Sequence, residues 1–326
     1  MRKGKGNLIG FAVLFGSMAA MGAFVGEYQV NIILMIAIWI IVAVAYRLLA
    51  TTGEFSLGHV VIMGIGGYSS AMFARYMGLP VWVCMPLGGL VCAGFAALTA
   101  YPMFRMKGFY FLLGSFALGE AVRLSWNRWK FPFGGPSGLW NIPAPHAGGI
   151  TFDTANSYFY LTLGIAAVCV YIMMRIDQSR FGRNLKAIHW QDSVAESLGI
   201  NVYRHKMTAY ITASFFAGIA GAVFAHFMGI VSPSQFSLHY MLYVLVWVIV
   251  GGTNTFWGSI IGVIALYSMQ EGMRSFGVPS EYIPMIYGII LIGVLFALPD
   301  GLESLPGKIR NWRKTREKQS NSIAES

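Results

Sequence analysis

The chain has 326 residues, of which 56% are hydrophobic and only 11% are charged, and its mean hydropathy is +0.61. Soluble globular proteins carry about 25% charged residues, so this composition excludes a cytosolic enzyme fold and a disordered chain, and predicts a protein that crosses a membrane many times. The net charge of +10 would indicate nucleic-acid binding in a soluble domain, but in a membrane protein the positive-inside rule accounts for it.

The amino terminus combines a short basic segment, residues 1–7, with an apolar stretch over 8–25. This is also the outline of a signal peptide. The apolar stretch is longer than the typical signal core of about 7–15 residues, and it ends without a clear small-x-small cleavage site. We therefore expect a first membrane span preceded by a cytoplasmic amino terminus.

Ten apolar segments approach the roughly 20 residues needed to cross a bilayer. The third, 55–77, contains four glycines and several polar residues, so we expect it to be broken or re-entrant. The predicted fold is an all-α polytopic membrane protein with about 8–10 transmembrane helices, occupying residues 8–298. The segments are 8–25, 30–50, 55–77, 80–102, 108–124, 157–175, 207–228, 240–256, 258–275 and 282–298.

Basic residues orient these spans. With the amino terminus inside, 18 of the 23 Lys and Arg residues fall in inner segments, and the cluster from Arg123 to Lys130 is the main exception. Both termini are then cytoplasmic, residues 299–326 form a basic cytoplasmic tail, and 125–156 is an outer loop. The four-span group of spans two to five begins on the outside, and the group of spans seven to ten begins on the inside. The two groups therefore have opposite orientations, which predicts inverted repeats. The charge needs no nucleic acid as a partner.

Side chains suited to chemistry are few within the spans. Cys84, Cys92 and Cys169 lie in apolar runs without paired spacing, so we expect small buried side chains and neither a disulfide nor a metal site. His59 is a candidate for lining a path through the membrane, with a packing histidine as the alternative. Glu120 and Arg123 are three residues apart on one helix, so we expect them to pair locally.

The longest polar stretch between spans, residues 176–206, predicts a short helix. Ser193 and Glu196 form a capping-box pattern, with Ser193 as the N-cap, and Gly199 is a natural helix stop. A basic arm containing Arg183 precedes this helix. Since so short a helix is unstable alone, it must pack on its own protein or dock into a partner, and both readings stay open.

Several motifs in this order resemble the permeases of branched-chain amino-acid ABC importers of the LivM type. The first is GRNLKAI at 182–188, followed by AESLGIN at 195–201 and Lys206 opening a span. The others are SLGH and GIGGY at 56–68, LGEAVR at 118–123, GGPSGL at 134–139, and VGG with WG at 250–258. The resemblance extends from about residue 30 to residue 298.

The resemblance implies a permease subunit that moves Leu, Ile and Val into the cell through a bacterial inner membrane. Its expected partners are a second related permease, two P-loop ATPase subunits, and a periplasmic or lipid-anchored substrate-binding protein. The 326 residues contain no G-x-x-x-x-G-K-[ST] sequence, so ATP would be bound by the ATPase partners and no cofactor or enzymatic activity is expected of this chain.

Three alternatives remain open from the sequence. The same architecture could import another small solute, such as urea, an amide or a sugar. An ion-coupled secondary transporter would need carboxylates deep in the spans, where Glu120 is the main candidate. A membrane enzyme would need clustered His, Asp or Glu side chains, and the sequence offers none.

The resemblance also assigns site residues. In the coupling loop 176–206, Val194 and Leu198 would present an apolar face to the ATPase. Of the EAA-x-x-x-G signature common in such loops, only Ala195 and Gly199 are present. We expect Ala195→Arg or Gly199→Asp to uncouple transport without loss of membrane insertion. The coupling candidates are Arg183, Ser193, Val194, Ala195, Glu196, Leu198 and Gly199; the path candidates are Ser56, Gly58, His59, Gly66, Gly67 and Glu120; and the outer-loop candidates, for docking the binding protein, are Gly134, Gly135 and Gly138.

Overall fold

The computed structural model describes residues 2–147, 150–151, 155–298 and 301–304. The chain divides into two compact units, residues 1–245 and 246–326. Each of the ten predicted spans corresponds to one helix. The helices are α1 (Arg2–Phe24), α2 (Glu27–Ala50), α3 (His59–Met77), α4 (Val81–Met103), α5 (Phe109–Arg128), α6 (Ala155–Gln178), α7 (Arg180–Trp190), α8 (Asp192–Ser197), α9 (Val202–Met228), α10 (Leu238–Gly251), α11 (Phe256–Ser275) and α12 (Ile283–Ala297).

Short elements connect these helices. Four 3₁₀ turns, labelled η1 to η4, and four strands of two residues each complete the described structure. They are η1 (Gly135–Ser137), η2 (Pro233–Phe236), η3 (Ser280–Tyr282), η4 (Leu302–Ser304), β1 (Leu139–Trp140), β2 (His146–Ala147), β3 (Ile150–Thr151) and β4 (Ile230–Val231). The strands pair antiparallel, β1 with β4 and β2 with β3.

Six helical segments among the described residues are long and apolar enough to cross a membrane. They are Gly6–Phe24, Glu27–Ala50, Val81–Met103, Asn156–Gln178, Val202–Met228 and Pro233–Gly251. Helices α3, α5 and α11 have 19, 20 and 20 residues, and their glycine, serine and charged residues lower their hydropathy. These observations confirm an all-α polytopic membrane protein.

The expected break in the third segment is wrong. Helix α3 runs without interruption from His59 to Met77, and the non-helical residues lie before it. Its glycines instead permit close packing on α9. A methyl group added at Gly66 would collide with the backbone of Gly218, and one added at Gly221 would collide with the Met63 carbonyl. In lipid, such close backbone approach replaces the hydrophobic drive between helices.

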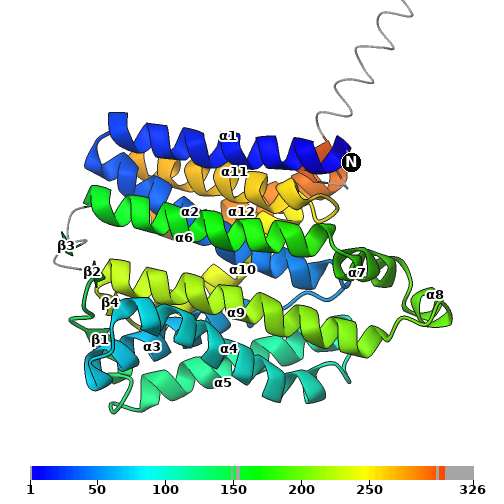
Figure 1. The fold of residues 1–326 in the computed structure, drawn as a ribbon, viewed down its shortest axis with the longest axis horizontal. Helices are drawn as coiled ribbons and strands as arrows, with labels where there is room; N and C mark the ends of the chain where they lie inside the picture. Colours follow the sequence, from blue (N-terminus) through cyan, green and yellow to red (C-terminus); the bar gives the residue numbers. More distant parts are fainter. Residues whose placement is uncertain (1, 148–149, 152–154, 299–300, 305–326) are drawn as a thin grey trace, which may run out of the picture. The chain divides into compact units, whose positions relative to one another are not determined.

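The first unit is built around α9, which packs on α3 and α4 along one side and on α2 along another. Helix α2 also packs on α6, and α6 on α1. Figure 1 shows α1, α6 and α9 running lengthwise beside one another, with α7 and α8 at one end. The division between the units falls inside α10, so it does not coincide with the two predicted inverted halves, which stay a prediction.

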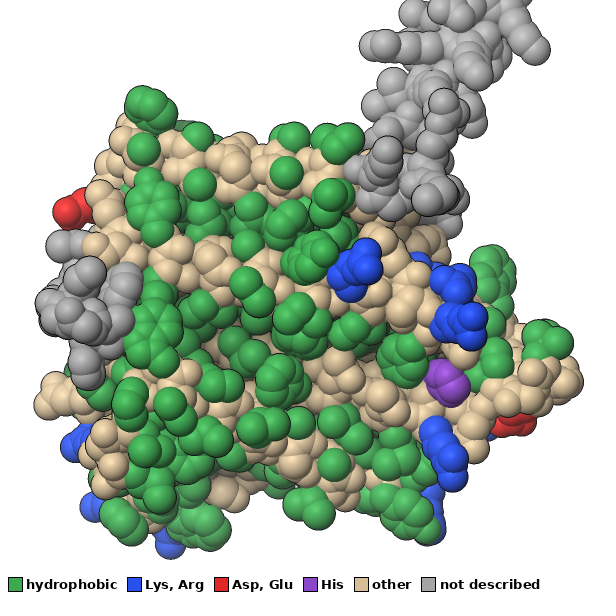
Figure 2. All heavy atoms as spheres, in the orientation of Figure 1, with side chains coloured by type: hydrophobic (Ala, Val, Ile, Leu, Met, Phe, Trp, Pro, Cys, Tyr) green, Lys and Arg blue, Asp and Glu red, His purple; other side chains and the backbone are tan. Residues whose placement is uncertain are grey.

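The sides of the first unit suit a lipid environment. Figure 2 shows hydrophobic side chains along the face formed by α5, α6 and α9, with Lys and Arg side chains toward its two ends. Exposed large apolar side chains of the first unit include Leu98 of α4, Leu113 of α5 and Val168 of α6. A soluble protein rarely exposes so extended an apolar surface, whereas hydrocarbon is its natural solvent.

The second unit holds α11 and α12 together with a buried polar contact. The Tyr287 hydroxyl lies 2.9 Å from both the Leu266 carbonyl and Gln270 Oε1, and it accepts a hydrogen bond from the Trp247 indole at 3.3 Å. Such interhelical hydrogen bonds join membrane helices.

The carboxylate of Glu303 closes the turn between α10 and α11. It accepts hydrogen bonds from the Asn254 and Thr255 amides, at 3.0 and 2.9 Å, and from the Thr255 hydroxyl. Thr255 is the N-cap of α11 but its side chain makes no capping bond within that helix, so Glu303 supplies the acceptor. Of the predicted tail 299–326, residues 301–304 therefore belong to this turn, and the rest lies outside the described residues.

Candidate coupling and transport sites

The segment predicted as a basic arm is a helix, α7. It begins immediately after α6, because Ser179 caps it by accepting a hydrogen bond from the Gly182 amide at 3.4 Å. Gly182 lies against the backbone of Asp177, where a side chain would collide. The basic residues of this segment therefore belong to a helix. The Arg183 guanidinium donates a hydrogen bond to the Gln178 carbonyl at 3.0 Å.

The predicted short helix exists as α8, but its start is corrected. The chain is extended at Gln191 (φ −166°, ψ 114°), which is the N-cap, and the helix begins at Asp192. An acidic residue in the first turn is favoured by the helix dipole. Ser193 is thus inside the helix, and the predicted capping box does not form.

The predicted stop at Gly199 is confirmed. Gly199 has φ +80°, its amide donates to the Glu196 carbonyl at 2.9 Å, and the Ile200 amide donates to the Ala195 carbonyl at 3.1 Å. These two bonds are those of a Schellman motif, with glycine in the left-handed position that side chains avoid.

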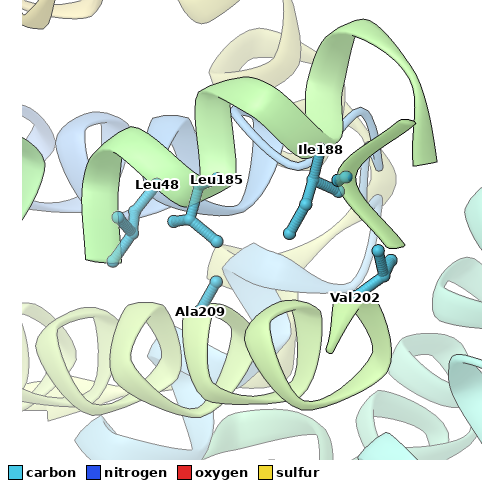
Figure 3. Packing of buried hydrophobic residues seen from close by; sticks show 6 residues of the cluster. Leu48, Leu185, Ile188, Val202 and Ala209 are labelled. Atoms are coloured by element: carbon cyan, nitrogen blue, oxygen red, sulfur yellow. The ribbon is translucent and has the colours of Figure 1, made fainter. Parts of the chain in front are cut away.

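Helix α8 has a buried face and an exposed face. Ala195 is 1% exposed and belongs to a hydrophobic cluster with Leu48, Leu185, Ile188, Val202 and Ala209. Figure 3 shows Leu185 and Ile188 of α7 directed toward Val202 and Ala209 of α9. Packing on its own protein, one of the two readings left open, therefore holds for this face.

Exposed apolar side chains lie at the end of α7 and on α8. Trp190, Val194 and Leu198 are 86%, 51% and 73% exposed. We call these three residues the α7–α8 apolar face. Ala195 is not part of it, so the expectation for Ala195→Arg changes: an arginine there would enter the cluster and displace α8 rather than act on a partner alone.

Two ion-pair networks anchor these helices, and the sequence reasoning missed both. Asp177, at the end of α6, pairs with Arg47 of α2 and with Lys186 of α7, each at 3.0 Å. Lys206, at the start of α9, pairs with Glu54 at 3.0 Å and with Asp192 of α8 at 3.1 Å. The sequence does show ionisable residues at the ends of apolar runs, but which of them form ion pairs depends on the tertiary structure.

Three of the path candidates, Ser56, Gly58 and His59, lie at the start of α3 and are buried. The ring of His59 is 1% exposed and packs edge-on against Tyr46, with ring centres 5.3 Å apart. The Ser56 amide donates a hydrogen bond to the Tyr46 hydroxyl at 3.1 Å, and the Ser56 hydroxyl accepts one from the Gly58 amide at 3.2 Å. Gly58 packs on the Ser115 carbonyl of α5. The structure brings these residues together at a helix contact, and their role in a path stays a prediction.

The remaining path candidates lie elsewhere. Gly66 and Gly67 face Gly218 and Gly221 of α9 at the close helix crossing. Glu120 forms an ion pair with Arg123 on the same helix, as predicted. The three cysteines are buried and free, also as predicted.

An apolar cavity of about 440 Å³ opens between α4, α6 and α9. None of the path candidates lines it. Its lining residues are Trp82, Met85, Pro86, Tyr160, Leu161, Gly164, Ile165, Val168, Cys169 and Ile219. A zwitterionic amino acid needs polar partners, so this cavity does not fit such a substrate.

The predicted outer loop, 125–156, is folded where it is described; residues 148–149 and 152–154 lie outside the described residues. Gly134, Gly135 and Gly138 all have positive φ, between +64° and +81°, and shape the turn η1. Strand β1 then pairs with β4 next to the end of α9. A docking role for these glycines stays a prediction.

A histidine in the last turn of α9 links this loop to the helices. His226 is buried, with Nδ1 2.8 Å from the Pro143 carbonyl and Nε2 2.9 Å from the Ser70 hydroxyl of α3. Because Nδ1 must donate to the carbonyl, Nε2 accepts from Ser70.

Together these features define a class: a multi-pass α-helical membrane protein with a folded, partly apolar helix pair between two of its spans. Residues 28–295 match the family described as "Branched-chain amino acid transport system / permease component". The chain belongs to this family of ABC transporter permeases, which are membrane components that act with ATPase and other subunits.

Relatives support the same assignment. The chain is 30% identical to the high-affinity branched-chain amino acid transport system permease protein LivM of Salmonella typhimurium and 28% identical to that of Escherichia coli, in each case over 85% of this chain and 70% of the relative. It is 24% identical to the nucleoside ABC transporter permease protein NupC of Lactococcus lactis, over 53% of this chain and 59% of that protein. No solved structure matches the chain.

Proposed function

We propose that this protein is the membrane-spanning permease of an ABC importer that moves branched-chain amino acids into the cell, driven by ATP hydrolysis in separate subunits. The observation that carries the substrate class is the similarity to two LivM proteins along 85% of the chain. The sequence contains no P-loop, which supports placing the ATPase in a partner.

The α7–α8 apolar face is the proposed docking site for the ATPase. Trp190, Val194 and Leu198 are exposed on helices that lie between two spans. An amphipathic helix whose apolar side is exposed suits a hydrophobic groove in a partner. The excess of Lys and Arg in this loop supports a cytoplasmic position for it and for both termini.

The rest of the proposed assembly follows the family resemblance. It comprises a second related permease, two P-loop ATPases, and a periplasmic or lipid-anchored binding protein that docks on the outer loop. The proposed location is the bacterial inner membrane.

Uptake measurements test the function. The permease, its partner permease, the ATPases and the binding protein are produced together in cells that lack branched-chain uptake, and accumulation of labelled leucine is followed with unlabelled isoleucine and valine as competitors. We expect accumulation that both compete for, and that stops when the P-loop lysine of the ATPase is replaced. Accumulation that continues without ATP hydrolysis would contradict the proposal.

A second candidate is the import of nucleosides, favoured by the similarity to the Lactococcus lactis permease, although over a shorter part of the chain. Labelled uridine in the same cells separates the two candidates. The ion-coupled alternative has less support, because the carboxylate of Glu120 is already paired with Arg123.

A further inference from the structure

Lys206 occupies a central position among the inner ends of several helices. Its ammonium group lies 3.0 Å from the Glu54 carboxylate and 3.1 Å from the Asp192 carboxylate. The side chains of Lys206, Glu54 and Asp192 are 9%, 5% and 31% exposed. Lys206 lies in the second turn of α9, Asp192 is the first residue of α8, and Glu54 lies in the connection from α2 to α3. One side chain thus joins three separate segments.

Glu54 extends the network to a fourth segment. Its second carboxylate oxygen accepts a hydrogen bond from the Gly108 amide at 3.1 Å, immediately before α5. The Gly108 backbone has φ +54°, so the start of α5 is fixed in a specific conformation. A chain of polar contacts therefore runs from α8 through Lys206 and Glu54 to α5.

The second network holds α7 differently. Asp177 joins α7 to the ends of α2 and α6 through Lys186 and Arg47. The ion pairs of the two helices therefore reach different spans, α2 and α6 from α7, and α9 and α5 from α8, although Leu185 and Ile188 also pack α7 on α9.

Stability alone does not explain such a network. The cost of removing buried ions from water largely offsets their attraction, so apolar residues at the same places often stabilise as well or better. Hydrophobic packing around Ala195 already holds α8 to the protein. An ion pair adds fixed partners and a fixed geometry, which is what transmission of a movement requires.

We propose that Lys206 is a positioning residue that transmits movement of α8 to the inner ends of α5 and α9. The inference rests on the proposed function, in which an ATPase moves α8. When α8 is displaced, Asp192 pulls Lys206, and the Lys206–Glu54 pair carries the displacement to the start of α5.

The test compares ATP hydrolysed with leucine imported, in proteoliposomes containing the complete complex and its binding protein. Asp192→Asn replaces the ion pair to α8 by at most a neutral hydrogen bond but leaves the buried Glu54–Lys206 pair, so we expect the permease to fold. The triple variant Glu54→Gln, Asp192→Asn, Lys206→Met removes all three charges without leaving one unpaired. Lys206→Arg preserves the charge, and Glu271→Gln is the matched control, since it breaks an ion pair confined to α11.

We expect the ATP hydrolysed per leucine imported to rise by about fivefold or more in Asp192→Asn and in the triple variant, the lower range of coupling between sites. The ratio should stay at the wild-type value in Lys206→Arg and Glu271→Gln. A purely structural role would reduce hydrolysis and import together and leave the ratio unchanged, and an unchanged ratio in Asp192→Asn overturns the inference. Failure of the wild-type complex to import leucine would instead count against the proposed function.

Discussion

The α7–α8 apolar face allows a decisive test of ATPase docking, through Leu198→Ser. Leu198 is the C-cap of α8 and is 73% exposed. In the permease alone we therefore expect its replacement to change the free energy of unfolding by less than about 0.5 kcal/mol. If the ATPase buries this side chain, its loss removes about 1.5–3 kcal/mol of binding free energy. The affinity for the ATPase should fall roughly 10- to 100-fold, at about 1.4 kcal/mol per factor of ten.

The assay is titration of purified ATPase subunit onto the detergent-solubilised permease, followed by leucine uptake in cells. Phe276→Ser is the matched control, because Phe276 is also an apolar C-cap residue, 91% exposed, at the end of α11. We expect normal ATPase affinity for the control. If the Leu198→Ser permease bound the ATPase with wild-type affinity, even when combined with Val194→Ser, docking on this face would be refuted.

Three further predictions concern stability; the first and third are read out by thermal unfolding of the purified permease, and the second by the yield of folded protein. Ala195→Arg places an unpaired charge in the buried cluster and should cost about 3 kcal/mol or more; loss of transport with unchanged thermal stability would contradict this. Gly221→Leu should abolish folded protein because the added side chain meets the Met63 carbonyl, whereas Gly94→Leu, which has open space, should be tolerated; equal yields would show that the close helix approach is not required. Glu303→Ala leaves the amides of the turn before α11 without their acceptor and should cost about 1–3 kcal/mol, with Glu303→Gln milder; an unchanged unfolding temperature in the alanine variant would argue against this closure.

The membrane helices could be predicted because hydropathy is a local property of the chain. Each of the ten segments became a helix, and the ends agree to within a few residues for most of them. The break expected at 55–77 did not appear, because glycine in a membrane helix also serves close packing. Glycine content alone cannot separate these two uses, since the difference depends on whether a second glycine helix, here α9, faces it.

The coupling loop was predicted in part. The helix stop at Gly199 follows from the local preference of glycine for positive φ and is present. Helix α7 was not predicted, because its basic residues favoured an arm, although Phe181, Leu185 and Ile188 recur at helical spacing. The N-cap of α8 is Gln191 and not the predicted Ser193, because Gln191 is also the C-cap of α7 and the next helix begins directly after it.

The ion pairs could not be predicted from spacing. Lys206 and Glu54 are 152 residues apart, and Arg47 and Asp177 are 130 apart. The sequence shows charged residues near the ends of many apolar runs, and which of them meet is decided by how the helices pack.

The contact made by Glu303 has a practical consequence for engineering the carboxyl end. The last apolar helix ends at Ala297, and a designer guided by hydropathy would attach a fluorescent reporter or an affinity handle just beyond it. A fusion that replaces the residues after Ala297 would remove Glu303, whose carboxylate holds the loop before α11. Cloning junctions placed after Ser304 keep that carboxylate and leave the loop closed.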